Sequence, residues 1–183
     1  MTYYGAKELA ASFRTVRGNT LKIAEEIPED KYSFSPAPGS RTVAQTLVHI
    51  ANLPKMQESV HSQGLTTLAG FDFMGFMGGM AAEEKKARTK AEIIELLKTS
   101  GESYAAFLEG LSEEKLGEVV TMPPGGAPPS RTRFDMVMSV KEHEMHHRGQ
   151  LMLVERLIGI TPHITRAMQE RMAAMQAQPA VKA

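Results

Sequence analysis

The hydrophobic positions of this chain recur in steps of three and four residues, which is the spacing of amphipathic helices. Four such stripes are long enough to form helices of several turns, and they lie within residues 9–27, 43–61, 93–111 and 134–157. A shorter stripe from about Thr165 to Met175 predicts a fifth helix. No segment shows the alternating pattern of a strand, so the chain is expected to be helical throughout.

Residues that start or interrupt helices support these boundaries. Ser40 or Thr42 is expected to cap the second helix, and Pro54 is expected to kink it. Thr89 with Glu92 fits the capping box of the third helix. Ser130 or Thr132 is expected to cap the fourth helix.

Residues 64–80 fit none of these patterns, because glycines interleave there with phenylalanines and methionines. The segment is too apolar for a solvated linker and too rich in glycine for a confident helix. It is therefore expected to be a loop. Whether this loop folds over a pocket, plugs the core or contacts another subunit is left open.

The pattern predicts an all-α fold, an antiparallel four-helix bundle with a short extra C-terminal helix. Residues 1–165 are expected to form the bundle domain, and residues 166–183 to form the short helix and a flexible tail. In helix bundles, binding sites are built from side chains on facing helices.

Composition narrows the function classes. Lysine plus arginine equals aspartate plus glutamate at 21 each, and no basic stripe follows a predicted helix, which argues against nucleic-acid binding. The chain has no cysteine, so any metal must be held by nitrogen and oxygen ligands. The beginning of the chain lacks a secretion-signal pattern and no apolar run is long enough for a membrane span. A cytoplasmic protein without a membrane partner is the expectation.

The candidate chemistry lies in the fourth predicted helix. His143 and His147 are four residues apart, so their Cβ atoms are expected to lie about 5–6 Å apart on one face, close enough for both imidazoles to bind one ion. His49, in the second predicted helix, can supply a third nitrogen ligand. His146 lies near the same face and competes with His143 as the ligand that pairs with His49. His61 and His163 are interpreted as structural residues.

The same segment also matches the H-E-x-x-H pattern of zinc proteases, with Glu144 as general base. The extended form of that pattern requires glycine and histidine where this chain has Gln150 and Leu153. Glu170 is the one downstream carboxylate considered as a ligand, and no strand precedes the motif to hold a peptide. A protease is therefore the least favoured interpretation.

Taken together, these motifs resemble the DinB/YfiT-like family of four-helix-bundle metalloenzymes. The matching stretches are Thr46–Ala51, which contains His49, the H-x-x-x-H-R-G-Q sequence of His143–Gln150, and Ile27–Tyr32 followed by Pro36. The resemblance extends over residues 5–160. It implies that His49, His143 and His147 hold a divalent cation that keeps open positions for water.

The resemblance also implies a small-molecule substrate. Family members with known chemistry include isomerases and transferases that use low-molecular-weight thiols. Activation or transfer of such a thiol, in an S-transferase or isomerase reaction, is therefore expected, or else hydrolysis of a small substrate. The catalytic group itself is not identified, and Glu144, His146 and Arg148 are the candidates. Zinc or nickel is the expected metal, with iron, cobalt and manganese as alternatives.

A non-catalytic alternative stays open, in which the protein is a dimeric, metal-binding stress-response protein. A homodimer is expected in either case. The chain has 13 methionines, and Met74, Met77 and Met80 fall in an apolar segment that one small core is not expected to hide.

Overall fold

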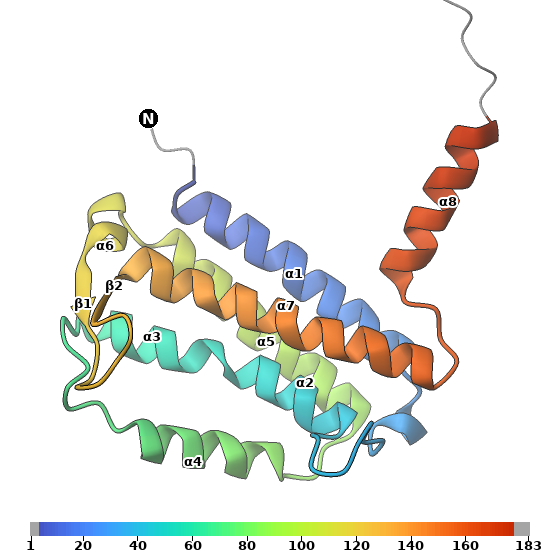
Figure 1. The fold of residues 1–183 in the computed structure, drawn as a ribbon, viewed down its shortest axis with the longest axis horizontal. Helices are drawn as coiled ribbons and strands as arrows, with labels where there is room; N and C mark the ends of the chain where they lie inside the picture. The colour runs from blue at the N-terminus through green and yellow to red at the C-terminus, as the bar shows by residue number, and fades with distance from the viewer. Residues whose placement is uncertain (1–3, 178–183) are drawn as a thin grey trace, which may run out of the picture.

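A computed structural model, described here for residues 4–177, shows a bundle of four helical columns (Figure 1). The all-α four-helix-bundle fold predicted from the hydrophobic pattern is thereby confirmed. The columns are α1 (Ala6–Glu26), α2 with α3 (Val43–Asn52 and Pro54–Ser62), α5 (Lys90–Glu109) and α7 (Arg133–Leu157). A 3-10 turn, η1 (Glu29–Lys31), follows α1.

The order of the columns depends on one crossing helix. Helix α4 (Phe73–Glu84) follows α3 in the chain and runs back along the outside of the bundle, beside α2, toward the start of α5 (Figure 1). Because of this return, α5 runs in the same direction as α2 and α3, whereas α1 and α7 run in the opposite direction. Helix α7 contacts both α1 and α2, so its side chains can take part in two separate interfaces.

The helix starts agree with the capping residues expected from the sequence. Thr42, Thr89 and Thr132 each accept a hydrogen bond from the backbone N–H three residues later, which satisfies a donor at a helix N-terminus. Pro54 separates α2 from α3, as predicted. Thr42 starts the short helix that carries His49, so this cap fixes where that histidine lies.

The loop predicted for residues 64–80 is wrong for its second half, which belongs to α4. Asp72 caps this helix by accepting a hydrogen bond of 2.8 Å from the N–H of Gly75. Only Met80 of α4 is buried, whereas Met74 is 84% exposed. The pattern failed here because three glycines and a mostly exposed surface leave no regular apolar stripe, while capping and the Met80 contact still hold the helix.

The expectation of no strand is also wrong. Strands β1 (Val119–Thr121) and β2 (Ser130–Thr132) form an antiparallel pair in which Val120 lies opposite Arg131. A short helix, α6 (Glu113–Gly117), precedes them. The strands are only three residues long, which is too short for an alternating pattern, and the β-branched residues of β1 favour the extended backbone.

The last helix, α8 (His163–Ala177), begins near the predicted position but projects away from the bundle (Figure 1). None of its residues is buried. Residues 178–183, predicted to form a tail, lie outside the described part of the chain. Within residues 4–177, no helix is both long and apolar enough to cross a membrane.

Candidate metal centre

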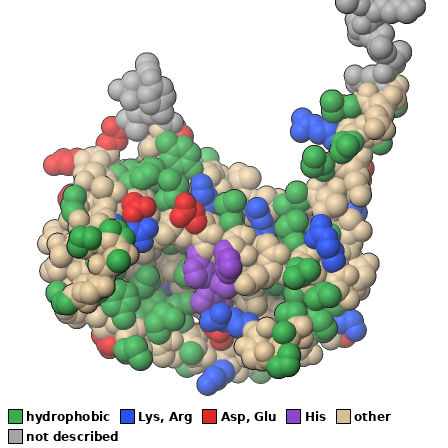
Figure 2. Space-filling view, in the orientation of Figure 1, with side chains coloured by type: hydrophobic (Ala, Val, Ile, Leu, Met, Phe, Trp, Pro, Cys, Tyr) green, Lys and Arg blue, Asp and Glu red, His purple; other side chains and the backbone are tan. Residues whose placement is uncertain are grey.

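Three histidines from two helices converge in the middle of the bundle. His49 comes from α2, and His143 and His147 lie one turn apart on α7. One ring nitrogen from each lies within 4.8 Å of the others, and among the described residues this is the only such group of three potential metal ligands. Figure 2 shows histidine side chains at the surface of this face, with basic side chains directly beside them.

The nitrogens that converge are the Nε2 atoms. His143 Nε2 lies 3.2 Å from His49 Nε2 and 2.8 Å from His147 Nε2. Three nitrogens about 2.0–2.1 Å from one tetrahedral zinc ion would lie roughly 3.4 Å apart, so the observed spacing is close to that of a ligand set. The side chains brought together are the three that the sequence predicts.

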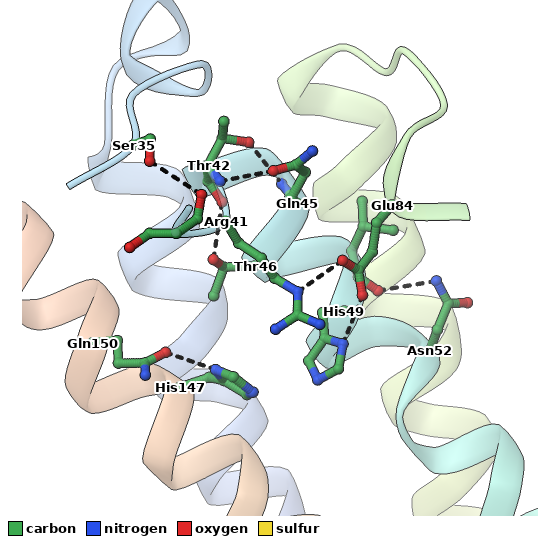
Figure 3. A network of polar contacts seen from close by, with 12 residues as sticks. Ser35, Arg41, Thr42, Gln45, Thr46, His49, Asn52, Glu84, His147 and Gln150 are labelled. Carbon is green, nitrogen blue, oxygen red and sulfur yellow. Dashed lines mark hydrogen bonds and ion pairs between the residues drawn. The ribbon is translucent and has the colours of Figure 1, made fainter. Parts of the chain in front are cut away.

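The outer nitrogens of two of these rings are held by oxygen acceptors. His49 Nδ1 donates to Glu84 Oε1 at 2.8 Å, and His147 Nδ1 lies 2.8 Å from Gln150 Oε1 (Figure 3). A carboxylate can only accept, so the proton of neutral His49 must be on Nδ1 and its Nε2 carries a lone pair. This arrangement, in which an outer acceptor fixes the tautomer, is typical of metal-binding histidines.

Electrostatics keep the three rings neutral. Burial is the main cause that lowers the pKa of His147, to about 4, and the neighbouring histidines lower it further. Burial also lowers the pKa values of His49 and His143. Neutral imidazoles have lone pairs to donate, but lone pairs facing one another at 2.8 Å repel unless a proton or a cation lies between them. The donor set therefore fits a divalent cation.

Glu84 joins the centre to α4 and to the loop before α2. Its Oε2 accepts a hydrogen bond of 2.7 Å from Arg41 Nε, while its Oε1 accepts from His49 (Figure 3). These contacts lower the pKa of Glu84 although burial acts in the opposite direction. Glu84 is thus a carboxylate that orients His49, and it lies at the end of the helix that the sequence predicted as loop.

Glu144, the general-base candidate, points away from the histidines. Its carboxylate is fully buried between α1 and α7 and accepts hydrogen bonds of 3.0 Å from both Nε and Nη2 of Arg17. The hydroxyl of Thr20 donates to the same carboxylate at 2.7 Å. A Cβ added at Gly101 would lie 2.8 Å from Arg17 Cγ, so this glycine provides the space for the arginine. Every oxygen of Glu144 is occupied by a structural contact.

The other candidates fall outside the converging group. His146 is exposed, and its Nε2 lies 3.1 Å from Gln150 Nε2, beside the cluster rather than within it. Arg148 is half-buried on α7, and Glu170 lies exposed on the projecting α8. His61 is buried and contacts Gln57 and Arg133, and His163 contacts Asn19, which agrees with a structural interpretation of both.

A cavity of about 740 Å³ opens beside the cluster. His147 and Glu84 form one part of its wall, and His146 and Gln150 continue that wall along α7. The volume lies within the range of about 300–1,000 Å³ that is usual for sites that bind small molecules. The cluster is therefore accessible to a small ligand from the direction of this cavity.

Comparison with known proteins identifies the family. The DinB family model matches residues 1–179, almost the whole chain. The chain belongs to the DinB family. The resemblance expected from the two histidine motifs is confirmed by a match over the full bundle and not by those motifs alone.

Individual relatives agree with this assignment. YjoA of Bacillus subtilis is 27% identical over 158 residues, which cover 85% of this chain and 92% of YjoA. The crystal structure of YjoA, described as a DinB-like protein, has a TM-score of 0.63 and covers 84% of this chain and 94% of that one. YfiT of B. subtilis, described as a probable metal-dependent hydrolase with an unusual four-helix bundle topology, has a TM-score of 0.69. It is 15% identical and covers 88% of this chain and 91% of its own, a likeness of fold.

Proposed function

We propose that this protein is a divalent-metal-dependent enzyme acting on a small substrate, with His49, His143 and His147 as the metal ligands. The observation that carries the proposal is the convergence of three Nε2 atoms. A cation bound there would act as a Lewis acid that activates a low-molecular-weight thiol or a water molecule. Zinc or nickel is the metal we expect, because neutral imidazoles suit both.

The residues around the cluster support this role. Glu84 and Gln150 hold the outer nitrogens of two rings, which fixes the direction of the lone pairs before a metal arrives. The adjoining cavity offers room for a substrate next to His147. S-transfer from a thiol and hydrolysis of a small substrate both use this arrangement. YfiT, which is described as a probable metal-dependent hydrolase, has a similar fold, and this likeness supports the proposal of metal-dependent chemistry.

The position of Glu144 argues against the protease interpretation. A general base must reach the proton that it abstracts. Glu144 instead lies on the side of α7 that faces α1, bound to Arg17 and Thr20. We therefore expect no peptide hydrolysis, and hydrolysis that disappears in Glu144→Gln while metal binding persists would overturn this assignment.

Metal analysis tests the proposal directly. Protein purified without a nickel column should contain, or bind after treatment with EDTA, one divalent ion per chain. His147→Ala should abolish this binding because two imidazoles remain, whereas His146→Ala, its matched control one position earlier, should keep the full stoichiometry. Equal binding by the two variants would contradict the ligand assignment.

A reaction screen then separates an enzyme from a metal-binding protein without activity. Zinc- and nickel-loaded protein would be incubated with low-molecular-weight thiols and a panel of electrophiles, and separately with small ester and amide substrates. We expect turnover that His147→Ala abolishes and that His146→Ala retains in part or in full. Binding of one metal without turnover on either panel would favour the non-catalytic alternative.

We also propose that the protein forms a homodimer through α8 and the outer face of α7. Met168, Met172 and Met175 on α8 are 64%, 51% and 68% exposed. Leu153 and Leu157 on α7 are each 57% exposed. A two-fold dimer needs matching surfaces on the same chain, and two apolar stripes meet that need. Light scattering of the wild type should give twice the monomer mass. Replacing the three methionines of α8 by glutamine should give a monomer. A monomeric wild-type chain would refute the dimer.

A further inference from the structure

Charged groups line the cavity beside the histidines, and some of their hydrogen-bond donors have no partner among the described residues. Its charged walls consist of two cations, Arg41 and Lys85, and one carboxylate, Glu84. Both oxygens of Glu84 are already occupied, one by Arg41 Nε and the other by His49. The charge available to a ligand in this cavity is therefore positive, and a divalent ion at the histidines would increase it.

Hydrogen-bond donors remain on both cations. Arg41 uses Nε for Glu84, and neither Nη1 nor Nη2 has a partner among the residues 4–177 that the structure describes. The ammonium group of Lys85 likewise has no partner within that range. The planar guanidinium presents its two terminal nitrogens side by side, a geometry that matches the two oxygens of a carboxylate or phosphate.

The rest of the wall combines polar side chains with an apolar patch. Val43, Leu151 and Val154 line the cavity, and each is buried in the bundle core. Leu153 and Ala81 extend this apolar wall toward solvent. A cavity that combines two cations with an apolar patch is complementary to a molecule with an anionic group on an apolar body.

We propose that this cavity binds a small organic anion, a carboxylate or phosphate attached to an apolar group, with Arg41 and Lys85 holding the anion. That this anion is a substrate rests on the proposed function. Its binding to the cavity can be tested without metal. Arg41 has a double role, because one edge of its guanidinium orients Glu84 and the other faces the ligand.

Ligand binding by calorimetry and saturation-transfer NMR tests the proposal on EDTA-treated protein, so that no metal contributes. The probes are benzoate and phenyl phosphate, their neutral counterpart benzamide, and acetate, which has the anion but no apolar ring. At least one of the two aromatic anions should bind tenfold or more tightly than benzamide and than acetate. Benzamide binding as tightly as both anions, or no aromatic anion binding, would overturn the proposal.

Variants show whether the named cations are responsible. Lys85→Gln and Arg41→Lys should each weaken the bound anion at least fivefold; Arg41→Lys keeps a cation for Glu84 but removes the paired terminal nitrogens. Lys86→Gln is the matched control, because Lys86 pairs with Glu83 outside the cavity, and it should leave affinity unchanged. Equal affinity of all three variants would show an adventitious site and overturn the assignment.

Repeating the titration with one equivalent of zinc separates this inference from the metal proposal. If zinc does not bind, the metal proposal fails, yet anion binding to the metal-free protein still decides the cavity. If zinc binds and the anion does not bind in either form, the cavity assignment fails alone. We expect zinc to tighten anion binding about tenfold, because a nearby positive charge is added.

Discussion

Two faces of helix α7, separated by a single step along the chain, have opposite electrostatic designs. On one face, Glu144 is fully buried, and its charge is compensated by Arg17 and its oxygens are hydrogen-bonded. On the other, the Nε2 atoms of His143 and His147 lie 2.8 Å apart, and that of His143 lies 3.2 Å from His49 Nε2. The first face is complete without a ligand, whereas the second needs a proton or a cation between its facing nitrogens.

The contrast between the two faces follows from the positions of the glutamate and the histidines around the helix. In H-E-x-x-H the glutamate lies about 100° around the helix from the first histidine, so in a bundle it faces a different neighbouring helix. Here that neighbour is α1, which supplies Arg17 and Thr20. The glutamate anchors the helix in the bundle while the histidines form the candidate site. Stability and ligand binding are thus predicted to respond to separate substitutions on one helix.

The largest effect should come from breaking the completed face. Arg17→Met leaves Glu144 buried without its counter-charge, and a buried pair broken on one side typically costs about 3–5 kcal/mol. Urea unfolding would measure the loss, with Arg14→Met as control, because Arg14 makes its ion pairs with Glu102 and Glu109 at the surface. The double variant Arg17→Met/Glu144→Leu should recover most of the stability. An Arg17→Met effect no larger than that of Arg14→Met would remove the contrast between the two faces.

The histidine face should stabilise the fold only when metal is present. Free zinc at 1,000 times its dissociation constant should raise the free energy of unfolding of the wild type by about 4 kcal/mol. His147→Ala should lose this increment and, without metal, unfold close to the wild type. Urea unfolding with zinc and with EDTA measures both. If metal-free His147→Ala is destabilised as much as Arg17→Met, the histidines are structural after all.

A second buried carboxylate, Glu155, shows what Glu144 would be without Arg17. Both oxygens of Glu155 are buried and have no hydrogen-bond partner among the described residues. Burial, and next the charge of Glu26, raise the pKa of Glu155 to about 7, although Arg166 and Arg156 act in the opposite direction.

The folded chain therefore binds the proton of Glu155 more tightly than the unfolded chain, and stability should fall as pH rises from about 4.5 through 7. Glu155→Gln should remove this slope and raise the free energy of unfolding at pH 8 by about 2–3 kcal/mol. Unfolding at pH 5 and pH 8 provides the measurement. If Glu155→Gln leaves the pH dependence of the free energy of unfolding unchanged, that dependence comes from other groups.

The smallest effect should come from the group that orients a ligand without touching the metal. Glu84→Gln removes the negative charge of the carboxylate that accepts the hydrogen bond from His49 Nδ1. Loss of such an outer partner of a ligating histidine typically lowers metal affinity about 10–100-fold. Zinc titration with a competing chelator would measure the change. Glu83→Gln is the control, since Glu83 pairs with Lys86 and Arg88. Equal affinities for the two variants would show that Glu84 only fastens α4.

Sequence reasoning found what depends on local pattern. Thr42, Thr89 and Thr132 are caps that act within one turn, and the pair of His143 and His147 follows from helical spacing alone. Arg17 was missed, although its position between Phe13 and Thr20 places it on the inward face of α1. That placement is a signal that a charged residue in a buried stripe needs a partner.

Other parts of the site could not be found from the chain alone. Glu84 reaches His49 only because α4 crosses back along the bundle, which depends on long-range packing. Residues 64–80 gave no clear period, so neither the helix nor its contact with the centre was visible in the pattern. Arg41 likewise reaches the cavity because the loop before α2 folds toward the end of α4.

Helix α4 has little packing to hold it, since Met80 is its only buried residue. One of its links to the rest of the protein is the hydrogen bond from His49 to Glu84. A cation on Nε2 makes the Nδ1 proton of the same ring more acidic and so strengthens this bond. By thermodynamic reciprocity, the docking of α4 then strengthens cation binding by the same factor by which the cation strengthens the docking of α4. The glycine-rich helix is in this sense an adjustable part of the candidate metal centre, and its amide hydrogens should exchange more slowly when the centre is occupied.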